Sequence, residues 1–412
     1  MTGVKQLAIQ SGERIATLDI VRGVAVIGIL AMNIVAFADV PAAYFNPLAQ
    51  TAAVSTADLV TYAANFILFD GKMRGLFSFL FGASLLLMSE TMALSLVRRR
   101  LFWLLLFGAA HFFLIWWGDI LITYAAIGFL ALAFRNAGRR GLVAAAIVLI
   151  AIQFAIYVAM TLYSLDLQGP VLSGTATTDQ LRSWEELTRD TIMPSPERRA
   201  EAIALYQGPW SSLVHHQVTE KAFFPVVGIF AFGWETLAYL LLGMAALKSG
   251  LMTGAWDDRR YRKWLLTGLA IVLPCYLVAL RFLFRSEFSA PVVFMWSFAA
   301  ASLLRPIMVV AIACLIILAT RRGGALTQRI AAAGRAAFSN YLGTSIVMTG
   351  LFYGWGLGLF ATLGRAELAL IVIAAWGVML LWSKPWLERY RYGPLEWAWR
   401  SLTLWRVQPF RR

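Results

Sequence analysis

The residues best suited to chemistry begin with a polar stripe on an apolar segment near the start of the chain. Asp19 and Arg22 stand three positions apart, and Asn33 follows eleven residues after Arg22. If this segment is a helix, Asp19 and Arg22 pair on one face. Asn33 returns to that face about three turns, or ~16 Å, further along. Because polar groups are costly on a membrane helix, the stripe is expected either to pair with other helices or to line a site.

A histidine inside a second apolar segment is the next candidate. His111 lies eleven residues beyond Arg100, which places it about 16 Å along a helix, and Asp119 follows eight residues later. A carboxylate beside an imidazole fixes its tautomer and raises its basicity, as a general base requires. We therefore assign His111 and Asp119 catalytic roles. The alternative is a core histidine that bonds to a backbone carbonyl or to a neighbouring helix.

Glu235 is the third catalytic candidate, because it stands near the middle of an apolar run. A carboxylate there serves as an acid or base, carries a proton, or pairs with a cation on another helix. Arg281 and Arg305, which also lie in apolar runs, are the cations available to it. For these two arginines, ion pairing that fixes helix packing is the favoured interpretation.

The segment Asp70-Gly71-Lys72-Met73-Arg74-Gly75 interrupts another apolar stretch. Its glycines allow the chain to break, and the cations Lys72 and Arg74 can meet an anionic group there. We expect both to contact substrate or donor. The alternative is an ordinary turn that joins two helices.

The whole composition indicates a membrane protein. Hydrophobic residues make up 60% of the 412 positions and charged residues 14%, whereas soluble domains carry about 25% charged residues. The net charge of +14 collects in short segments between apolar runs, as a positive-inside bias predicts, so nucleic-acid binding is not expected. The two cysteines and the His215-His216 pair lack further ligands at metal-binding spacing, so no metal site is expected.

Ten apolar runs are long enough to span a bilayer, which predicts an all-α polytopic membrane bundle. They lie near 17–38, 73–93, 101–117, 119–134, 141–164, 223–247, 264–284, 292–319, 336–361 and 366–383. The shorter stretch 57–69 reads as an interfacial or re-entrant helix. With both termini in the cytoplasm, the basic segments fall inside, and 39–56, which has no Lys or Arg, falls outside.

This topology divides the chain into three parts. Residues 1–164 form an N-terminal membrane half, and 223–412 form a C-terminal membrane half with a cytoplasmic tail. Between them, 165–222 is a polar loop on the outer side, too small for an independent domain.

Several motifs along the chain resemble one family of bacterial membrane proteins. They are Arg14-x3-Leu18-Asp19-x2-Arg22-Gly23-x-Ala25 with Asn33; Gly71-Lys72-x2-Gly75; Gly118-Asp119; Gly334-Arg335-x3-Ser339-Asn340-Tyr341-Leu342; and Gly393-Pro394-Leu395-Glu396-Trp397-x-Trp399-Arg400. Together they look like the YeiB-like proteins, whose C-terminal region is domain of unknown function 418. The resemblance covers nearly the whole chain apart from 165–222.

The resemblance implies membership of the transmembrane acyltransferase superfamily, beside heparan-α-glucosaminide N-acetyltransferase and the acyltransferase-3 enzymes. Such proteins transfer an acyl group from a cytoplasmic donor of the acyl-CoA type, without a covalently bound cofactor, to an acceptor at the outer side. By this likeness Asp19, Arg22, Asn33, Arg335 and Asn340 contact donor or substrate. The chain departs from the pattern in two respects: Asn33 stands where acyltransferase-3 proteins keep a histidine, and 44–58, the stretch where the heparan enzyme keeps its catalytic histidine, contains none.

Two functions of different class therefore stand side by side. The first is a membrane-embedded acyltransferase in which His111, oriented by Asp119 or Asp19, is the base. The second is a small-molecule or proton-coupled transporter in which Glu235 and His111 titrate along a pathway. Either would work in the lipid bilayer on a small-molecule substrate, and the sequence leaves open a homodimer. A cavity that joins Arg22, Asn33 and His111 and opens to the cytoplasm would favour transfer chemistry.

Overall fold

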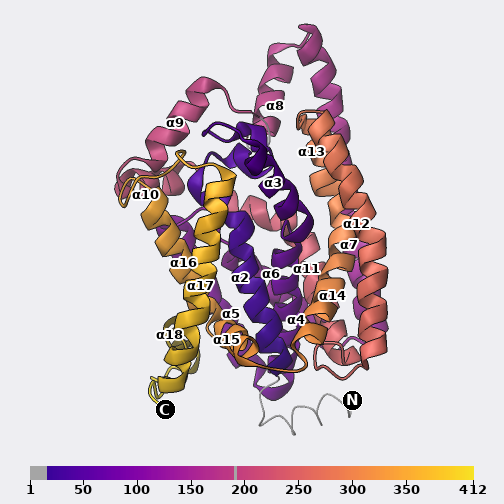
Figure 1. Ribbon diagram of the computed structural model, residues 1–412, viewed down its shortest axis with the longest axis vertical. Helices are drawn as coiled ribbons and strands as arrows, with labels where there is room; N and C mark the ends of the chain where they lie inside the picture. The colour runs from indigo at the N-terminus through magenta and orange to yellow at the C-terminus, as the bar shows by residue number, and fades with distance from the viewer. Residues whose placement is uncertain (1–15, 190–192) are drawn as a thin grey trace.

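The computed structural model describes residues 16–189 and 193–412, so Arg14 lies outside the described residues. These residues form a bundle of helices (Figure 1). Within the described ranges there is no β-sheet, only an isolated bridge between Tyr390 and Arg411. Helix α2 begins at the same end of the bundle as the C-terminus (Figure 1). We call this end proximal and the opposite end distal.

Ten helices form the main part of the bundle, and each of the ten predicted runs overlaps one of them. They are α2 (Ala16–Ala38), α4 (Lys72–Thr91), α5 (Leu94–Leu114), α6 (Leu121–Ala131), α7 (Arg139–Ser173), α11 (Phe224–Ser249), α12 (Asp258–Arg285), α14 (Ala301–Thr320), α16 (Ala337–Phe352) and α17 (Arg365–Arg389). The prediction of an all-α polytopic membrane bundle is confirmed.

Seven helices of the described chain are long and apolar enough to cross a membrane, when α3 with α4 and α13 with α14 each count as one. The other three predicted spans depart from that standard for physical reasons. Helix α5 includes Arg98–Arg100 in its first turns. Helices α6 and α16 are short, with 11 and 16 residues.

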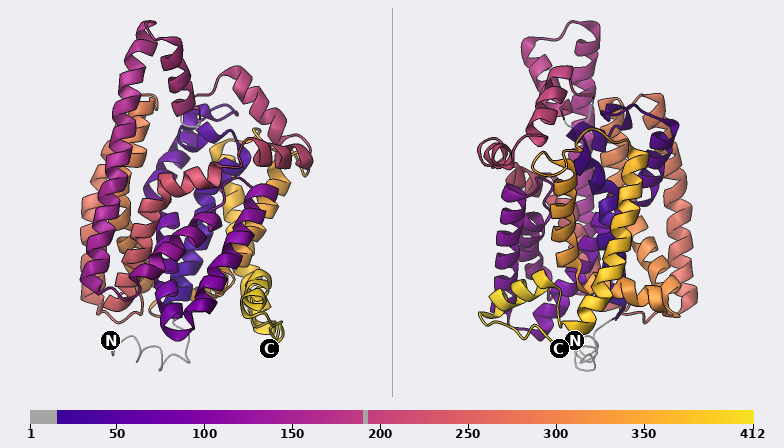
Figure 2. Two further views of the ribbon diagram at one scale, coloured as in Figure 1. Left: turned by 180° about the vertical axis from the view of Figure 1, so that it is seen from behind. Right: turned by 60° about the vertical axis from the view of Figure 1, so that its left-hand side comes forward.

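Shorter helices connect the long ones. They are α3 (Thr56–Leu68), α8 (Thr178–Thr188), α9 (Pro196–Tyr206), α10 (Trp210–Thr219), α13 (Ala290–Val293), α15 (Ala325–Arg335) and α18 (Pro394–Leu404), with a π-helical turn at Phe294–Ala300 and 3-10 turns at Pro41–Tyr44, Pro47–Ala49 and Leu132–Phe134. Helices α8, α9 and α10 lie at the distal end (Figure 1). Helix α18 lies crosswise to α17 at the proximal end (right-hand view of Figure 2).

The predicted short helix at 57–69 exists as α3, but it leads directly into α4. Ser55 and Asp58 begin α3 with a capping box, in which each side chain bonds the other residue's backbone N–H. The helix breaks at Gly71, whose φ of 63° is left-handed and favours glycine. The break leaves Asp70 and Lys72 facing the interior of the bundle, where both are buried.

The ends of α16 and α7 are among those that differ from the predicted ranges. Helix α16 stops at Phe352 rather than 361, because three glycines at 354, 356 and 358 favour turns, and Leu357 N–H bonds Gly350 O instead of continuing the helix. Helix α7 continues past 164 to Ser173, so the polar loop begins later than expected. Its end is marked by Gly174, with a φ of 69°.

Helix α2 occupies the centre of the bundle and packs against α4, α14, α15, α16 and α17. At the proximal end α2 and α15 approach so closely that neither glycine at their crossing has room for a side chain. A Cβ on Gly23 would overlap the carbonyl of Ile330, and a Cβ on Gly334 would overlap the carbonyl of Asp19. This contact brings together glycines from two of the sequence motifs, more than 300 positions apart.

Candidate functional site

His111 and Asp119 form the closest pair among the predicted catalytic residues. Nδ1 of His111 lies 2.7 Å from Oδ2 of Asp119, and both side chains are almost completely buried. The other carboxylate oxygen accepts a bond of 2.9 Å from the backbone N–H of Ile122, at the start of α6. Asp119 is therefore held from two directions, and it favours the tautomer of His111 that carries a proton on Nδ1.

The second ring nitrogen of His111 has no such partner. Its Nε2 atom is buried and accepts no hydrogen bond from any residue that the structure describes. The ring instead lies among aromatic neighbours: its centroid is 5.4 Å from that of Tyr341 and 6.1 Å from that of Trp116. Because a buried polar atom without a partner is costly, this nitrogen is a place where a reacting group can bind.

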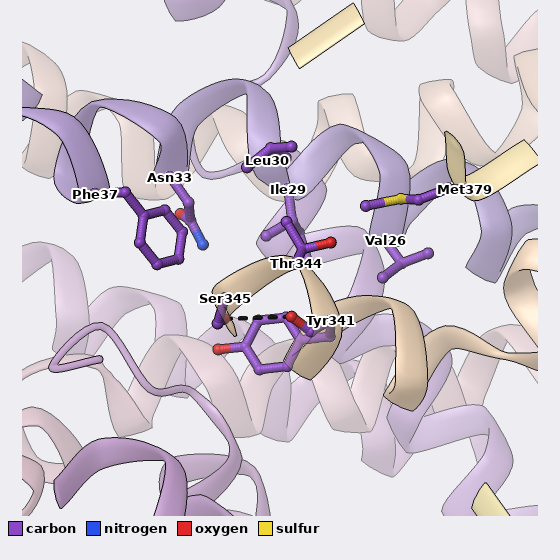
Figure 3. A pocket seen from close by; sticks show the side chains of 9 residues that line it. All are labelled: Val26, Ile29, Leu30, Asn33, Phe37, Tyr341, Thr344, Ser345 and Met379. Carbon is purple, nitrogen blue, oxygen red and sulfur yellow. Dashed lines mark hydrogen bonds between the residues drawn. The ribbon is translucent and has the colours of Figure 1, made fainter. Parts of the chain in front are cut away.

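Asn33 lies in the distal half of α2 and lines a narrow cavity (Figure 3). The volume is about 10 Å³, which is room for roughly one water molecule. The lining comes from α2, α16 and α17 and consists of Val26, Ile29, Leu30, Asn33, Phe37, Tyr341, Thr344, Ser345 and Met379. Tyr341 and Phe37 connect this cavity to the histidine, because Tyr341 lies against the His111 ring and Phe37 stacks on Trp116 at 3.8 Å.

Asp19 and Arg22 pair as predicted, with Nη1 of Arg22 3.1 Å from Oδ1 of Asp19. Arg22 also donates a bond of 3.0 Å to Ser84 on α4. Neither Arg22 nor His111 is among the residues that line the Asn33 cavity. The polar stripe of α2 is therefore divided between a helix-joining pair at the proximal end and a cavity at the distal end.

Glu235 belongs to a second buried site, which we call the charge cluster: Asp70, Lys72, Arg74, Glu235 and Arg305. Oε2 of Glu235 lies 2.7 Å from Nη2 of Arg74, and Oε1 lies 3.8 Å from Nη1 of Arg305. Oε1 also accepts a bond of 3.1 Å from the Tyr239 hydroxyl. Of the two cations considered for Glu235, Arg305 is its neighbour, whereas Arg281 is exposed on the surface of α12.

Arg305 connects the charge cluster to the break between α3 and α4. Its Nη2 atom lies 3.1 Å from Oδ2 of Asp70 and donates a bond of 2.6 Å to the carbonyl of Ser297. Ser297 belongs to the π-helical turn, where the widened backbone leaves carbonyls available to side chains. One guanidinium therefore holds together the α3–α4 junction, α11 and α14.

Lys72 and Arg74 occupy different places in the charge cluster. Lys72 is fully buried; its Nζ donates to the carbonyls of Phe66 at 2.6 Å and Asp70 at 3.2 Å, and lies 3.8 Å above the Tyr276 ring. Arg74 pairs with Glu235. Counted as fully ionised, the cluster carries three cations and two carboxylates.

The two motifs of the C-terminal part meet at the proximal end. Glu396 on α18 accepts bonds from the backbone N–H groups of Phe338 at 2.7 Å and Ser339 at 3.1 Å, and from the Ser339 hydroxyl. A carboxylate is thus placed at the N-terminus of α16, where the helix dipole favours negative charge. Burial nevertheless raises the pKa of Glu396 above its ordinary value, against these hydrogen bonds.

Asn340 is buried and makes three bonds within the protein. Its Nδ2 donates to the carbonyl of Ala333 at 3.0 Å and to Ser383 at 3.2 Å, and its Oδ1 accepts from Trp382 at 2.9 Å. The side chain thus joins α15, α16 and α17, and these bonds occupy its donor and acceptor groups. Arg335 is the last residue of α15 and is partly buried.

Sequence reasoning did not assign a site role to Tyr341, Trp116 or Tyr239. These aromatic side chains surround the buried polar groups, but an aromatic residue in an apolar run gives no sign of what it contacts. The sequence marks Asp70 only as part of the turn that interrupts an apolar stretch. Among the residues described, no three His, Cys, Asp or Glu side chains gather as metal ligands would.

The fold and its buried polar groups define a polytopic α-helical membrane protein. A family described as "Protein of unknown function (DUF418)" matches residues 246–406. "Uncharacterized protein YeiB" of Escherichia coli (strain K12) is 31% identical, over 95% of this chain and 97% of that protein. "Uncharacterized protein YxaH" of Bacillus subtilis (strain 168) is 32% identical, over 97% of this chain and 96% of that protein.

The chain therefore belongs to the YeiB-like family that carries domain of unknown function 418. No solved structure matches it.

Proposed function

We propose that the protein is a membrane-embedded acyltransferase, which moves an acyl group from a cytoplasmic donor of the acyl-CoA type to an acceptor reached from the outer side. One observation carries the proposal: His111 is oriented by Asp119 at 2.7 Å, while its Nε2 atom has no hydrogen-bond partner among the described residues. A base whose free nitrogen is buried and whose tautomer is fixed is arranged to take a proton from a substrate.

In the proposed reaction Nε2 of His111 acts first as a base and then as an acid. Nε2 removes the proton from an acceptor hydroxyl or amine, whose oxygen or nitrogen attacks the thioester carbonyl of the donor. The carbon–sulfur bond breaks, and the thiolate of CoA leaves and takes up the proton from Nε2. Throughout, Asp119 accepts the Nδ1 hydrogen bond and stabilises the imidazolium that forms between the two proton transfers.

The Asn33 cavity is the place for the reacting carbonyl in this proposal. The side-chain amide of Asn33 and the hydroxyl of Tyr341, which lies beside His111, supply hydrogen-bond donors for the oxyanion that forms from this carbonyl. At about 10 Å³ the cavity is too small for a donor. The proposal therefore requires α2 to move away from α16 when the donor binds.

The proposed orientation places the proximal end in the cytoplasm of a bacterial inner membrane. Basic residues are abundant in the connections and tail at that end, including 135–140, 257–263, 321–329 and 384–412. The distal connection at 39–55 has no Lys or Arg. A positive-inside bias of this kind favours a cytoplasmic location for both the start of α2 and the C-terminus.

The test is acyl transfer by the purified, full-length protein in lipid nanodiscs supplied with radiolabelled acetyl-CoA and a panel of alcohols and amines. Wild-type protein is expected to release CoA thiol and label an acceptor. His111→Gln should lower the rate by about 10²–10⁴-fold, because general-base catalysis is lost. The matched control is His215→Gln with His216→Gln on α10, which should leave the rate unchanged.

Two results would contradict the proposal. One is a folded wild-type protein that neither binds nor consumes acetyl-CoA or longer acyl-CoA donors. The other is a His111→Gln variant that transfers acyl groups at the wild-type rate.

The charge cluster favours a second candidate, a proton-coupled or small-molecule transporter. Asp70, Lys72 and Arg74 lie at the α3–α4 break, and Arg305 bonds the carbonyl of Ser297 in the π-helical turn before α14. Buried charges at broken helices are typical of transport sites. Here the test is substrate flux into proteoliposomes under a proton gradient; a gradient-driven flux that Glu235→Gln abolishes would support transport, and equal flux would exclude Glu235 as the carrier.

A further inference from the structure

Three hydrogen-bond donors at the proximal end of α5 have no partner within the part of the chain that the structure describes. They are Nε of Arg99, Nε of Arg100 and Nε1 of Trp103, all buried. Arg99, Arg100 and Trp103 lie within about one helical turn, so their side chains project from neighbouring positions of α5. Buried donors without partners are costly, and three together point to an acceptor that completes the site.

Aromatic rings of α18 and the residue after it fix the positions of both guanidinium groups. The Arg100 guanidinium lies 3.8 Å above the Trp399 ring, and the Trp399 indole donates a bond of 2.9 Å to the carbonyl of Arg100. Trp405 lies 5.7 Å from the Arg99 guanidinium and 5.9 Å from the Trp103 ring. Trp405 has a left-handed φ of 53°, an unusual conformation for a large side chain, and it directs this ring toward α5.

The charges around these donors favour an anion. Arg400 and Arg22 lie close enough to Arg100 to repel it, and Glu396 attracts it. Glu396, however, is already bonded to Ser339 and to the start of α16. Within the described residues no ion pair neutralises Arg99 or Arg100, and a bound phosphate would offset their mutual repulsion.

Exposed apolar side chains lie beside the three donors, and they favour a lipid over a soluble ligand. Phe102 and Leu106 are one helical turn apart on α5, adjoin the arginines, and are 49% and 41% exposed. Beyond the site, Trp405 and Val407 are 68% and 75% exposed. A tryptophan-rich crossing helix at the end of a membrane bundle is typical of the lipid interface, where the headgroup is polar and the chains are not.

We propose that Arg99, Arg100 and Trp103, together with α18, form a binding site for the phosphate of an anionic phospholipid in the leaflet at the proximal end. The phosphate oxygens accept bonds from the two Nε atoms and the indole N–H. The acyl chains lie along Phe102 and Leu106. The bound lipid also helps to hold helix α18 against α5. The position of α18 therefore depends on the lipid composition of the membrane.

The test compares lipid binding by the full-length protein, measured by native mass spectrometry after release from nanodiscs of phosphatidylglycerol and phosphatidylcholine. Wild-type protein is expected to retain phosphatidylglycerol in preference. Each arginine contributes about fivefold to anionic-lipid affinity, so Arg99→Gln with Arg100→Gln should weaken retention by about 25-fold. Trp103→Phe should weaken it by about tenfold or more, because it removes one hydrogen bond to a charged group.

The matched control is Arg139→Gln with Arg140→Gln, which removes two exposed arginines at the proximal end of α7 and should leave retention unchanged. If the Arg99/Arg100 double variant does not fold, Trp103→Phe and Arg400→Gln carry the test, each with a reduced preference. Equal retention of the two lipids by wild-type protein, or equal losses in the test and control variants, would overturn the proposal.

A separate arm distinguishes a lipid headgroup from a soluble phosphate. Pyrophosphate and adenosine 3′,5′-bisphosphate are titrated into wild-type protein in phosphatidylcholine nanodiscs, and then into protein with bound phosphatidylglycerol. The lipid proposal expects neither compound to bind through Arg99 and Arg100. Binding that the double variant loses, or displacement of phosphatidylglycerol, would overturn the lipid assignment in favour of a soluble phosphate ligand.

Discussion

The pair of His111 and Asp119 and the charge cluster around Arg305 are both buried polar sites, but they differ in the kind of group that is left without a partner. In the charge cluster, Glu235 faces two guanidinium groups and a tyrosine hydroxyl, and Arg305 faces two carboxylates and a carbonyl, while the N–H of its Nε atom has no acceptor in the described chain. In the histidine pair, Nε2 has no partner in the described chain. Ion-paired groups hold helices together, whereas an imidazole nitrogen without a partner is available to accept a proton from a substrate.

The largest expected effect comes from breaking the charge cluster. Arg305→Gln leaves Asp70 without its ion-pair partner and Glu235 with one cation fewer, inside the bundle. Removing one partner of a buried ion pair costs about 3–5 kcal/mol of stability. Thermal unfolding of the detergent-solubilised protein measures this loss. Arg281→Gln is the control, because Arg281 is exposed on α12, and an equally large loss there would show that pairing is not the cause.

The second prediction concerns the histidine pair and tests whether it serves chemistry rather than packing. Asp119→Asn keeps the size of the side chain but no longer favours the Nδ1-protonated tautomer. Under the proposed function it should lower acyl transfer by about 10²-fold or more, with a stability loss smaller than that of Arg305→Gln. Transfer rates and unfolding temperatures are measured on the same preparations. A variant that loses stability but keeps its transfer rate would make the pair structural.

A third prediction asks whether breaking the hydrogen bonds of a carboxylate outside the spans costs less stability than breaking an ion pair inside them. Glu396→Ala deprives the first N–H groups of α16 and the Ser339 hydroxyl of their acceptor. The expected loss is about 1–3 kcal/mol, less than for Arg305→Gln, because water can reach the proximal end more easily. A loss equal to that of Arg305→Gln would remove the distinction between the two locations.

The smallest expected effect is a pH dependence that the same carboxyl group contributes. Because burial raises the pKa of Glu396, the folded state binds its proton more tightly than the unfolded state does. The contribution of Glu396 to the free energy of unfolding therefore falls as the pH rises above the ordinary pKa of a glutamate, with a slope of at most about 1.4 kcal/mol per pH unit. Unfolding temperatures between pH 5 and pH 7 should show this slope in wild-type protein and lack it in Glu396→Gln. Parallel profiles would contradict the assignment.

The positions of the spans could be predicted from the sequence because hydrophobic length is a local property. The limits of α16 could not be placed as well, since the apolar run continues to 361 although the three glycines end the helix at Phe352. His111 and Asp119 could also be paired in advance, because only eight residues separate them and the connecting turn is short.

The charge cluster could be predicted only in part: the sequence offers Arg305 and Arg281 as cations for Glu235, and Arg305 is the one that lies beside it. Asp70 and Arg305 are 235 positions apart, and their contact depends on how α3, α4 and α14 cross. The bond between Glu396 and Ser339 likewise spans 57 positions. In both cases the sequence shows which groups need partners, but the choice of partner is made by tertiary packing.

The glycine crossing of α2 and α15 has a mechanical consequence. Because Gly23 and Gly334 leave no space between the two backbones, the proximal end of α2 is held in a fixed position at this crossing. Asn33 lies ten residues further along, about 15 Å from the crossing. A small tilt of α2 about the crossing therefore displaces Asn33 and the wall of its cavity while Arg22 and Asp19 hardly move, and access to the site can change without any helix sliding along its axis.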